Sequence, residues 1–419
     1  MRLVGSTVMG EEPLRDARFA TLLTLDEQFL QNPHELYGRL RAEQPVHEVI
    51  LPRGIKVWLV TRYDDVHTVL TEPTISKDIV SAVPLLERHT TAEEPQSYEA
   101  ELALAGHMLN TDPPDHTRLR ALVNKAFTNR RVEQLRGRVE QAADELLDAM
   151  ADQDEVDLLP AYAFPLPTTV ICQLLGVPDS DKDEFRDVSI TMTSAAQHEE
   201  MADAAMRMAA YLTRLVESKR ENPADDLLSA LVNPSDDNER LTSAELQSTA
   251  FLLLVAGHET TVNLIGNGVA MLLRDPEQLA ALRADPSLMP GTVDEILRHE
   301  GPLNIATYRY TTQPLQLGDV LIPAGEFVMV SLASANRDPA VFDDADRFDI
   351  TRNANGHMAF GYGIHYCVGA QLARMEGEIA IGKLLDRFPR LAFARDPGEL
   401  RWRPSTLMRG LETLPLRLR

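Results

Sequence analysis

The sequence predicts a mainly α-helical protein with a minor β component. Beyond residue 114, apolar residues recur at three- and four-residue steps over most of the chain, which is the spacing of one helix face. Runs typical of strands are confined to two short regions, 47–61 and 314–333. No internal repeat and no low-complexity linker interrupts the chain, so we expect a single domain over residues 1–419.

The elements follow from local patterns. Two β-rich runs around Pro52-Arg53-Gly54 predict a hairpin over 47–61. Segment 131–150 predicts an amphipathic helix because its apolar residues share one face. These are Val132, Leu135, Val139, Ala142, Leu146 and Met150.

A longer helix is predicted over 243–274. Thr242 and Glu245 have the spacing of a capping box, and Asp275-Pro276 ends the segment. At 1.5 Å per residue this helix would be roughly 48 Å long. Its middle, TAFLLLVAG, is apolar on every side, so we expect it to pass through the centre of the protein.

After the strand-like runs and turns of 314–333, the segment 332–366 shows little periodicity. A loop of that length in a compact chain is usually functional or disordered.

The composition limits the possible functions. Lys and Arg number 41 and Asp and Glu number 64, and the net charge of −23 argues against nucleic-acid binding. No stretch approaches the roughly 18 consecutive apolar residues that a membrane span needs, and the N-terminal apolar run is too short for a secretory signal. We therefore expect a cytoplasmic monomer that binds neither nucleic acid nor membrane.

The two cysteines lie in different settings. Cys172, in TTVICQLLG, suits a buried structural role. Cys367, in FGYGIHYCVG (360–369), lies at the start of a predicted helix, whose N-terminus favours thiolate over thiol. The glycines there let the backbone approach a ligand closely. A metal ligand is favoured over a structural thiol, although one cysteine can hardly support a zinc site, and two are too few for an iron–sulfur cluster.

AGHETT (256–261) places polar residues within the predicted central helix. Gly257 costs about 1 kcal/mol relative to alanine in a helix interior, and a buried acid needs a partner. A zinc-protease motif would need histidine at position 262, where the chain has Val262. The alternatives are a helix that serves chemistry and a kinked structural helix beside a solvent pocket.

The run Phe360-Gly361-x-Gly363-x-His365-x-Cys367-x-Gly369, followed by Leu372-Ala373, resembles the haem-binding loop of the cytochrome P-450 family. The resemblance covers nearly the whole chain. It implies a triangular, mainly α fold with small sheets, in which haem b lies between the long central helix and the helix after the cysteine loop. It also implies that the Cys367 thiolate is the proximal ligand of the iron, with Phe360 packed beside the sulfur.

The same resemblance assigns further roles. Ala256 and Gly257 would lie over the haem face, and Glu259 and Thr260 would form the acid–alcohol pair that delivers protons for O₂ activation. The haem propionates would be held by His116, Arg120, Arg309 and His365. Met108 and Leu109 would pack against the haem. On residue pattern alone, a solvated basic helix face is the alternative for His116 and Arg120.

Glu295 and Arg298 resemble the family's E-x-x-R pair, which would form a buried network with Arg347 and pin the cysteine loop. Alone, an acid–base pair at this spacing is commonplace on an exposed helix.

Segment 118–138 carries seven Lys or Arg and one Glu, although the whole chain is acidic. The chain has no GxGxxG fingerprint, so electrons from NAD(P)H would have to arrive through partner proteins. We expect an acidic ferredoxin, served by a ferredoxin reductase, to dock on this segment. The alternative is a merely solvated face.

AGHETTVNLIGNG resembles the branch that modifies polyketide macrolactones and other bulky secondary metabolites, some of whose members accept steroids. The expected reaction inserts one atom of O₂ into a C–H bond or an alkene. Expected pocket walls come from about 78–106 and 186–200, and from Leu253, Leu254, Ala256, Ile305, Ala306 and Met408. The alternatives are a peroxide-dependent peroxygenase, a haem-based sensor or carrier, and a steroid or terpenoid substrate.

Overall fold

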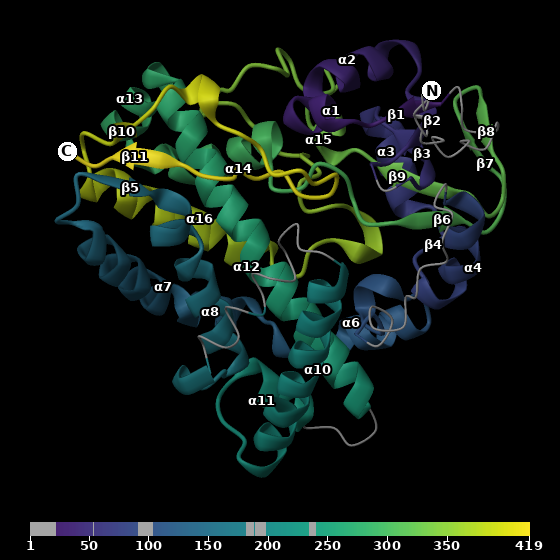
Figure 1. Cartoon of the computed structure of the whole chain (residues 1–419), viewed down its shortest axis with the longest axis horizontal. Helices are drawn as coiled ribbons and strands as arrows, with labels where there is room; N and C mark the ends of the chain where they lie inside the picture. Colours follow the sequence, from purple (N-terminus) through teal and green to yellow (C-terminus); the bar gives the residue numbers. More distant parts are fainter. Residues whose placement is uncertain (1–21, 53, 91–103, 182–187, 189–197, 234–239) are drawn as a thin grey trace, which may run out of the picture.

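A computed structural model describes residues 22–52, 54–90, 104–181, 188, 198–233 and 240–419. Helices make up most of it, and the long helix α12 passes through the middle of the molecule (Figure 1). The helices are α1 (Glu27–Gln31), α2 (Pro33–Glu43), α3 (Tyr63–Thr71), α4 (Ile79–His89), α6 (Asp115–Ala126), α7 (Asn129–Met150), α8 (Pro165–Leu175), α10 (His198–Glu221), α11 (Leu227–Val232), α12 (Ser243–Arg274), α13 (Pro276–Ala284), α14 (Met289–Glu300), α15 (Leu332–Ala335) and α16 (Ala370–Arg387).

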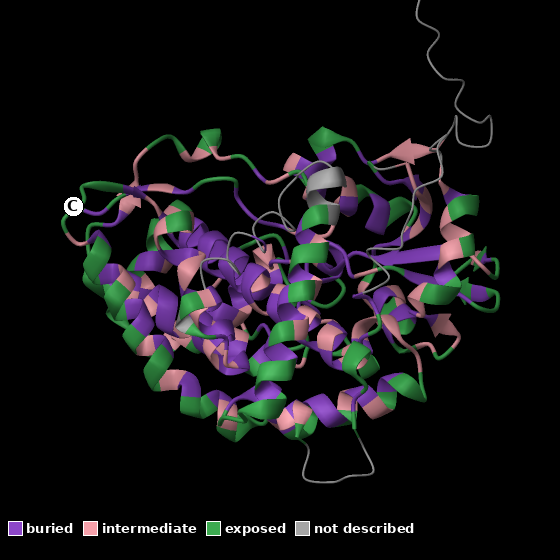
Figure 2. Cartoon of the chain, turned by 60° about the horizontal axis from the view of Figure 1, so that its bottom comes forward, coloured by how far each residue is buried: buried purple, intermediate pink, exposed green. Residues whose placement is uncertain are grey.

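The central helix has the predicted bounds. The Thr242 side chain accepts a hydrogen bond from the Glu245 N–H, and the Glu245 carboxylate accepts one from the Thr242 N–H, which completes the capping box. Helices α8, α10, α14 and α16 pack on α12. Buried residues fill the interior of this helical part, and exposed residues face outward (Figure 2).

Helix α7 confirms the prediction for segment 131–150 with one change. Five of the six predicted apolar residues are buried, but Leu147 takes the place expected for Leu146, which is only half-buried. Leu147 lies four residues after the buried Ala143, and residues at this spacing share one face of a helix, so Leu147 is on the buried face.

The β structure is small, as predicted. The main sheet has the order β1 (Leu23–Thr24), β2 (Val46–Ile50), β3 (Lys56–Val60), β9 (Phe327–Val330), β6 (Arg309–Thr311) and β4 (Ile75–Ser76). The expected hairpin is the β2–β3 pair, in register from Val46 opposite Val60 to Ile50 opposite Lys56.

Two smaller sheets complete the fold. One has the order β10 (Ala392–Phe393), β11 (Pro415–Arg417) and β5 (Glu155–Asp157), and the other pairs β7 (Leu315–Leu317) with β8 (Val320–Ile322). Between β7 and β8 the chain turns at Gly318, whose φ of +54° favours glycine.

The segment after β9 is largely irregular, as its sequence predicts. Apart from α15 and a short turn at Gly363–His365, it has no helix or strand before α16. Within the described ranges, no helix combines the length and apolar character needed to cross a membrane.

Candidate active site

The cysteine loop folds back on itself just before α16. The Cys367 N–H donates to the Phe360 carbonyl at 3.0 Å. Gly361 and Gly363 have φ values of +70° and +71°, the left-handed region that favours glycine. A Cβ at Gly363 would lie 2.6 Å from the Leu70 carbonyl oxygen at the end of α3, so the loop packs closely there.

The Cys367 thiol does not have the thiolate bias that its position in the sequence predicts. Burial raises its pKa, although the Gly369 N–H, Arg120 and Arg374 all act to lower it. The Cys367 side chain is nevertheless exposed. A bound metal cation would deprotonate such a thiol outright. Cys172, in contrast, is fully buried on α8, as expected of a structural residue.

The middle of α12 is partly open. Ala256 is exposed although most of the helix is buried, and Thr260 is half-buried with its hydroxyl donating to the Ala256 carbonyl at 2.9 Å. Gly257 has a packing role, because a Cβ there would lie 2.8 Å from Ile171 Cδ1 on α8. The glycine therefore lets α8 approach α12 closely.

Glu259 forms an ion pair that the sequence did not indicate. Its carboxylate accepts a hydrogen bond from Arg403 Nη1 at 2.8 Å, and Arg403 Nη2 donates to Asn263 Oδ1 at 2.5 Å. The acid expected to relay protons is thus held by an arginine from the C-terminal loop.

Four groups expected to hold carboxylates lie close to one another. The rings of His116 and His365 are 4.3 Å apart, and Arg120 donates to the Tyr366 carbonyl at 2.6 Å. Burial lowers the pKa of His365 to about 2, and the neighbouring cations act in the same direction. Arg309 is buried on β6 and donates to the Thr307 carbonyl at 2.8 Å.

Lys77 is a fifth member of this cluster and was missed by the sequence analysis. It is buried, its Nζ donates to the Thr307 hydroxyl at 2.6 Å, and its positive charge contributes to lowering the pKa of His365. Lysine beside Asp78 after a short strand carries no recognisable motif, so no sequence signal pointed to it.

The cluster fits a ligand with two carboxylates. His116 Nε2 is buried without a hydrogen-bond partner among the described residues. The carboxylate of Asp112, whose charge acts on both Lys77 and His116, already accepts hydrogen bonds from the Ser76 hydroxyl and the Lys77 N–H. Buried cations without matching anions cost several kcal/mol each. Two propionates would satisfy these groups, and Cys367 beside Arg120 would supply the iron ligand.

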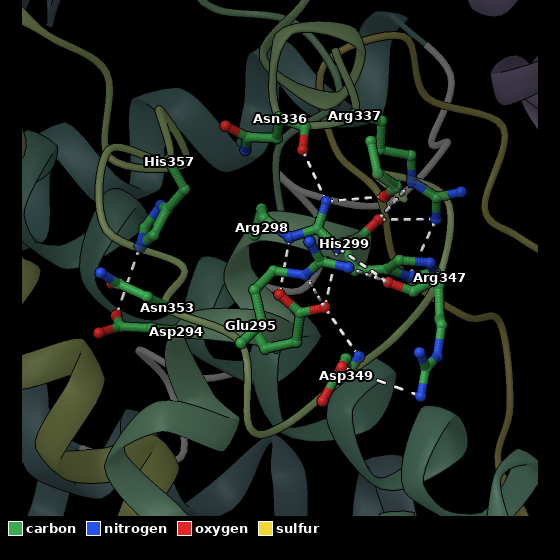
Figure 3. A network of polar contacts seen from close by, with 12 residues as sticks. Asp294, Glu295, Arg298, His299, Asn336, Arg337, Arg347, Asp349, Asn353 and His357 are labelled. Atoms are coloured by element: carbon green, nitrogen blue, oxygen red, sulfur yellow. Dashed lines mark hydrogen bonds and ion pairs between the residues drawn. The ribbon is translucent and has the colours of Figure 1, made fainter. Parts of the chain in front are cut away.

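The predicted Glu–Arg pair is fully buried. Arg298 makes two hydrogen bonds to the Glu295 carboxylate, at 2.7 and 2.8 Å, and both side chains have no exposed surface. Its remaining donors bind the carbonyls of Asn336, Ala345 and Arg347 (Figure 3).

The prediction that the Arg347 side chain completes this network is wrong. That side chain is 60% exposed and reaches only toward Asp349, at 3.9 Å (Figure 3). Arg352 takes the position, with Nε 3.4 Å from Glu295 Oε1 and 12% exposure. Arg347 contributes its carbonyl alone, because the irregular loop turns its side chain outward.

The expected pocket residues divide into two groups. Ala256 and Met408 keep exposed surface, and Met408 pairs with Leu303 across an isolated β-bridge. The other four are buried: Leu253 and Ala306 keep 6% and 7% of their surface, and Leu254 and Ile305 keep none and pack in the core, contrary to expectation. Segments 91–103 and 186–187, like 189–197, lie outside the described residues. Met108 is buried and Leu109 packs against the same core.

The basic segment 118–138 is partly neutralised. Arg118 pairs with Glu245, Arg136 with Glu133 and Arg131 with Asp225. Arg130 and Arg138 are exposed and form no ion pair among the described residues. The adjoining cysteine loop exposes three large apolar side chains, Tyr362, Ile364 and Tyr366.

In the described part of the chain, no three residues among His, Cys, Asp and Glu lie close enough together to hold a metal ion.

Comparison with known proteins identifies the family. A family model described as cytochrome P450 matches residues 171–399. The cytochrome P450 monooxygenase PikC of Streptomyces venezuelae is 50% identical, over 94% of this chain and 93% of its own length. The 6-deoxyerythronolide B hydroxylase of Saccharopolyspora erythraea is 42% identical, over 92% of this chain and 96% of its own.

Solved structures agree. The tirandamycin C-bound P450 monooxygenase TamI superposes with a TM-score of 0.87 at 50% identity, covering 95% of this chain and 100% of that one. The predicted mainly helical fold with small sheets is therefore confirmed. The chain belongs to the cytochrome P450 family and is a monooxygenase.

Proposed function

We propose that this monooxygenase holds haem b with Cys367 as the iron ligand and inserts one atom of O₂ into a bulky lipophilic secondary metabolite such as a polyketide macrolactone. The observation that carries the haem assignment is the buried cationic cluster beside Cys367, in which His116 Nε2 has no hydrogen-bond partner among the residues that the structure describes. Membership of the family supports the reaction class, and this cluster supports the proposed position of the cofactor.

Each residue has a distinct task in this proposal. His116, Arg120, Arg309 and His365 bind the propionates, and the Gly369 N–H tempers the charge on the Cys367 sulfur. Bound haem would supply the activation of O₂. Thr260, whose hydroxyl donates to the Ala256 carbonyl, and the buried Glu259 would deliver protons from solvent to the reaction site.

The proposed site is tested by the reduced carbon monoxide difference spectrum of Cys367→Ala and Cys172→Ala. We expect Cys172→Ala to keep the long-wavelength Soret band of thiolate ligation and Cys367→Ala to lose it. Retention of the band by Cys367→Ala would refute the assignment.

The substrate class rests on relatives. One is named for 6-deoxyerythronolide B, and the similar solved structure holds tirandamycin C. Spin-state titration with both compounds, and with vitamin D₃ as a steroid-like probe, tests the proposal. A response to vitamin D₃ alone would favour the steroid alternative over the macrolactone.

We also propose that an acidic ferredoxin docks on segment 118–138, where Arg130 and Arg138 are exposed. Arg120 joins this segment to the cysteine loop, which exposes Tyr362, Ile364 and Tyr366 beside it. The double variant R130E/R138E should slow the first electron transfer and weaken its salt dependence. The double variant R283E/R390E, an equal charge change at exposed residues outside this segment, is the matched control. Equal rates for both variants would refute this docking site.

A peroxygenase is the second candidate within catalysis, but a specific observation favours the O₂-dependent reaction. The chain keeps Glu259 buried in its central helix, and direct use of peroxide needs no such acid to deliver protons. Turnover with peroxide alone, compared with turnover in a ferredoxin system, separates the two.

A further inference from the structure

The guanidinium of Arg403, on the C-terminal loop, contacts two successive turns of the central helix. Arg403 Nη1 donates to Glu259 Oε1 at 2.8 Å, and Arg403 Nη2 donates to Asn263 Oδ1 at 2.5 Å. Because Glu259 and Asn263 are four residues apart on α12, they share one face of the helix. A single planar fork can therefore bind both.

The loop is shaped to make this contact. The Arg403 N–H donates to the Gly410 carbonyl at 2.9 Å, and Trp402 pairs with Leu411 across an isolated β-bridge. A Cβ at Gly410 would lie 2.1 Å from Asn263 Oδ1 and 2.9 Å from Arg403 Nη2. Only glycine leaves room there for the guanidinium and the amide together.

The ion pair between Glu259 and Arg403 is partly open to solvent. The Glu259 side chain is 8% exposed, whereas that of Arg403 is 30% exposed. Arg403 Nε and Asn263 Nδ2 are buried without a hydrogen-bond partner among the described residues. The arginine thus lies between the buried carboxylate and the surface, and this junction has unused polar groups that a water molecule could satisfy.

We propose that Arg403 is the positioning residue for Glu259. The guanidinium holds the carboxylate on the solvent side of α12. The carboxylate then takes a proton from solvent, leaves the arginine as a neutral acid, and passes that proton inward on the side of Thr260. This inference rests on the proposed role of Glu259 in proton delivery.

The experiment uses the holoenzyme with O₂, NADPH and a ferredoxin system, without any organic substrate. In this oxidase reaction, O₂, NADPH and one proton give hydrogen peroxide and NADP⁺. With a second NADPH and a further proton, the same O₂ gives two molecules of water. The peroxide released per NADPH therefore reports how well protons are delivered.

We expect Glu259→Gln and Arg403→Met each to raise the peroxide released per NADPH about twofold or more. Arg403→Lys, which keeps the cation, should lie nearer the wild type. In the E259Q background, Arg403→Met should add nothing. The matched control is Arg401→Met, because Arg401 lies on the same loop but pairs with Glu27 at 3.0 Å and is 57% exposed. It should behave as wild type.

Three outcomes would overturn the proposal: Arg403→Met behaving as wild type while Glu259→Gln does not, Arg401→Met matching Arg403→Met, or full additivity of the two substitutions. Thermal unfolding of the wild type, both single variants and the double variant tests the pair without any turnover. Additive shifts of the melting temperature would overturn the pairing itself. Glu259→Gln could release as much peroxide per NADPH as the wild type while the melting temperatures still show that Glu259 and Arg403 are coupled. In that case the proton-delivery role of Glu259 fails and the pair is structural.

Discussion

Two glutamate–arginine pairs, Glu295–Arg298 and Glu259–Arg403, show how one kind of contact serves different ends. In the first, neither side chain has exposed surface, the carboxylate is bound at both oxygens, and three carbonyls take the remaining donors of Arg298. In the second, the Glu259 carboxylate accepts from Arg403 at 2.8 Å, and that arginine is 30% exposed. The first pair is closed to solvent, whereas the second is partly open to it.

The difference follows from what each pair holds together. Arg298 joins α14 to the irregular segment that leads to the cysteine loop, through the carbonyls of Asn336, Ala345 and Arg347 (Figure 3). Buried carbonyls need donors, so this guanidinium replaces the hydrogen bonds that a helix or a sheet would provide. Arg403 joins α12 only to the C-terminal loop, whose backbone satisfies part of its own hydrogen bonding.

The largest effect on stability should come from breaking the Glu295–Arg298 pair. Arg298→Met leaves the Glu295 carboxylate and three carbonyls buried without their donor, so the free energy of unfolding should fall by about 3–5 kcal/mol. Urea denaturation of the holoprotein, followed by circular dichroism, measures this loss. Arg403→Met is the matched control and should cost less, because water can reach the carboxylate. Equal losses for the two variants would contradict the distinction between the pairs.

A third buried glutamate, Glu376, forms no ion pair with an arginine in the described part of the chain. Glu376 on α16 is buried, its Oε2 has no hydrogen-bond partner among the described residues, and burial raises its pKa to about 8. The folded protein therefore keeps a proton there that the unfolded chain, with the ordinary pKa of 4.5, releases. Stability should fall as the pH rises from 4.5 to about 8.

Glu376→Gln should remove this dependence. The variant should be more stable than wild type at pH 8, and the difference should shrink toward pH 5 by up to about 1.4 kcal/mol per pH unit. Urea denaturation at pH 5, 6.5 and 8 measures it. Glu295→Gln is the informative contrast, because it should lose stability at every pH. A constant difference between Glu376→Gln and wild type across the range would mean that Glu376 has a partner.

These pairs also show what sequence reasoning could reach. The capping box at Thr242 and Glu245 and the apolar run after it located α12 correctly, because both signals are local. Glu295 and Arg298 lie within one turn, so their pairing was also predictable. Arg403 is 144 residues from Glu259, and no spacing links them.

The choice between Arg347 and Arg352 was beyond the sequence for a related reason. Both lie in the run DADRFDITR, and in a segment without periodicity the pattern cannot indicate which side chain turns inward. The same limit applies to Leu254 and Ile305, whose apolar character fits a pocket wall and a core equally well. Only tertiary packing separates the two roles.

The smallest expected effects on stability come from Arg347 and Arg352, the two arginines beside the Glu295–Arg298 pair. Arg352 lies 3.4 Å from the Glu295 carboxylate, and its Nη2 donates to the Asp344 carbonyl at 3.0 Å, so Arg352→Met should cost about 1–3 kcal/mol of unfolding free energy. Arg347→Met removes only an exposed side chain, so its cost should stay within about 0.5 kcal/mol. The Arg347 carbonyl, which Arg298 uses, is unchanged by either substitution.

The double variant R347M/R352M extends this test. If Arg352 alone completes the network, the double variant should lose no more than the sum of the two single losses and should match Arg352→Met closely. A larger loss would mean that Arg347 turns inward when Arg352 is absent. The two side chains would then be interchangeable partners of Glu295, and the irregular segment before the cysteine loop would be held by whichever arginine is available rather than by one fixed geometry.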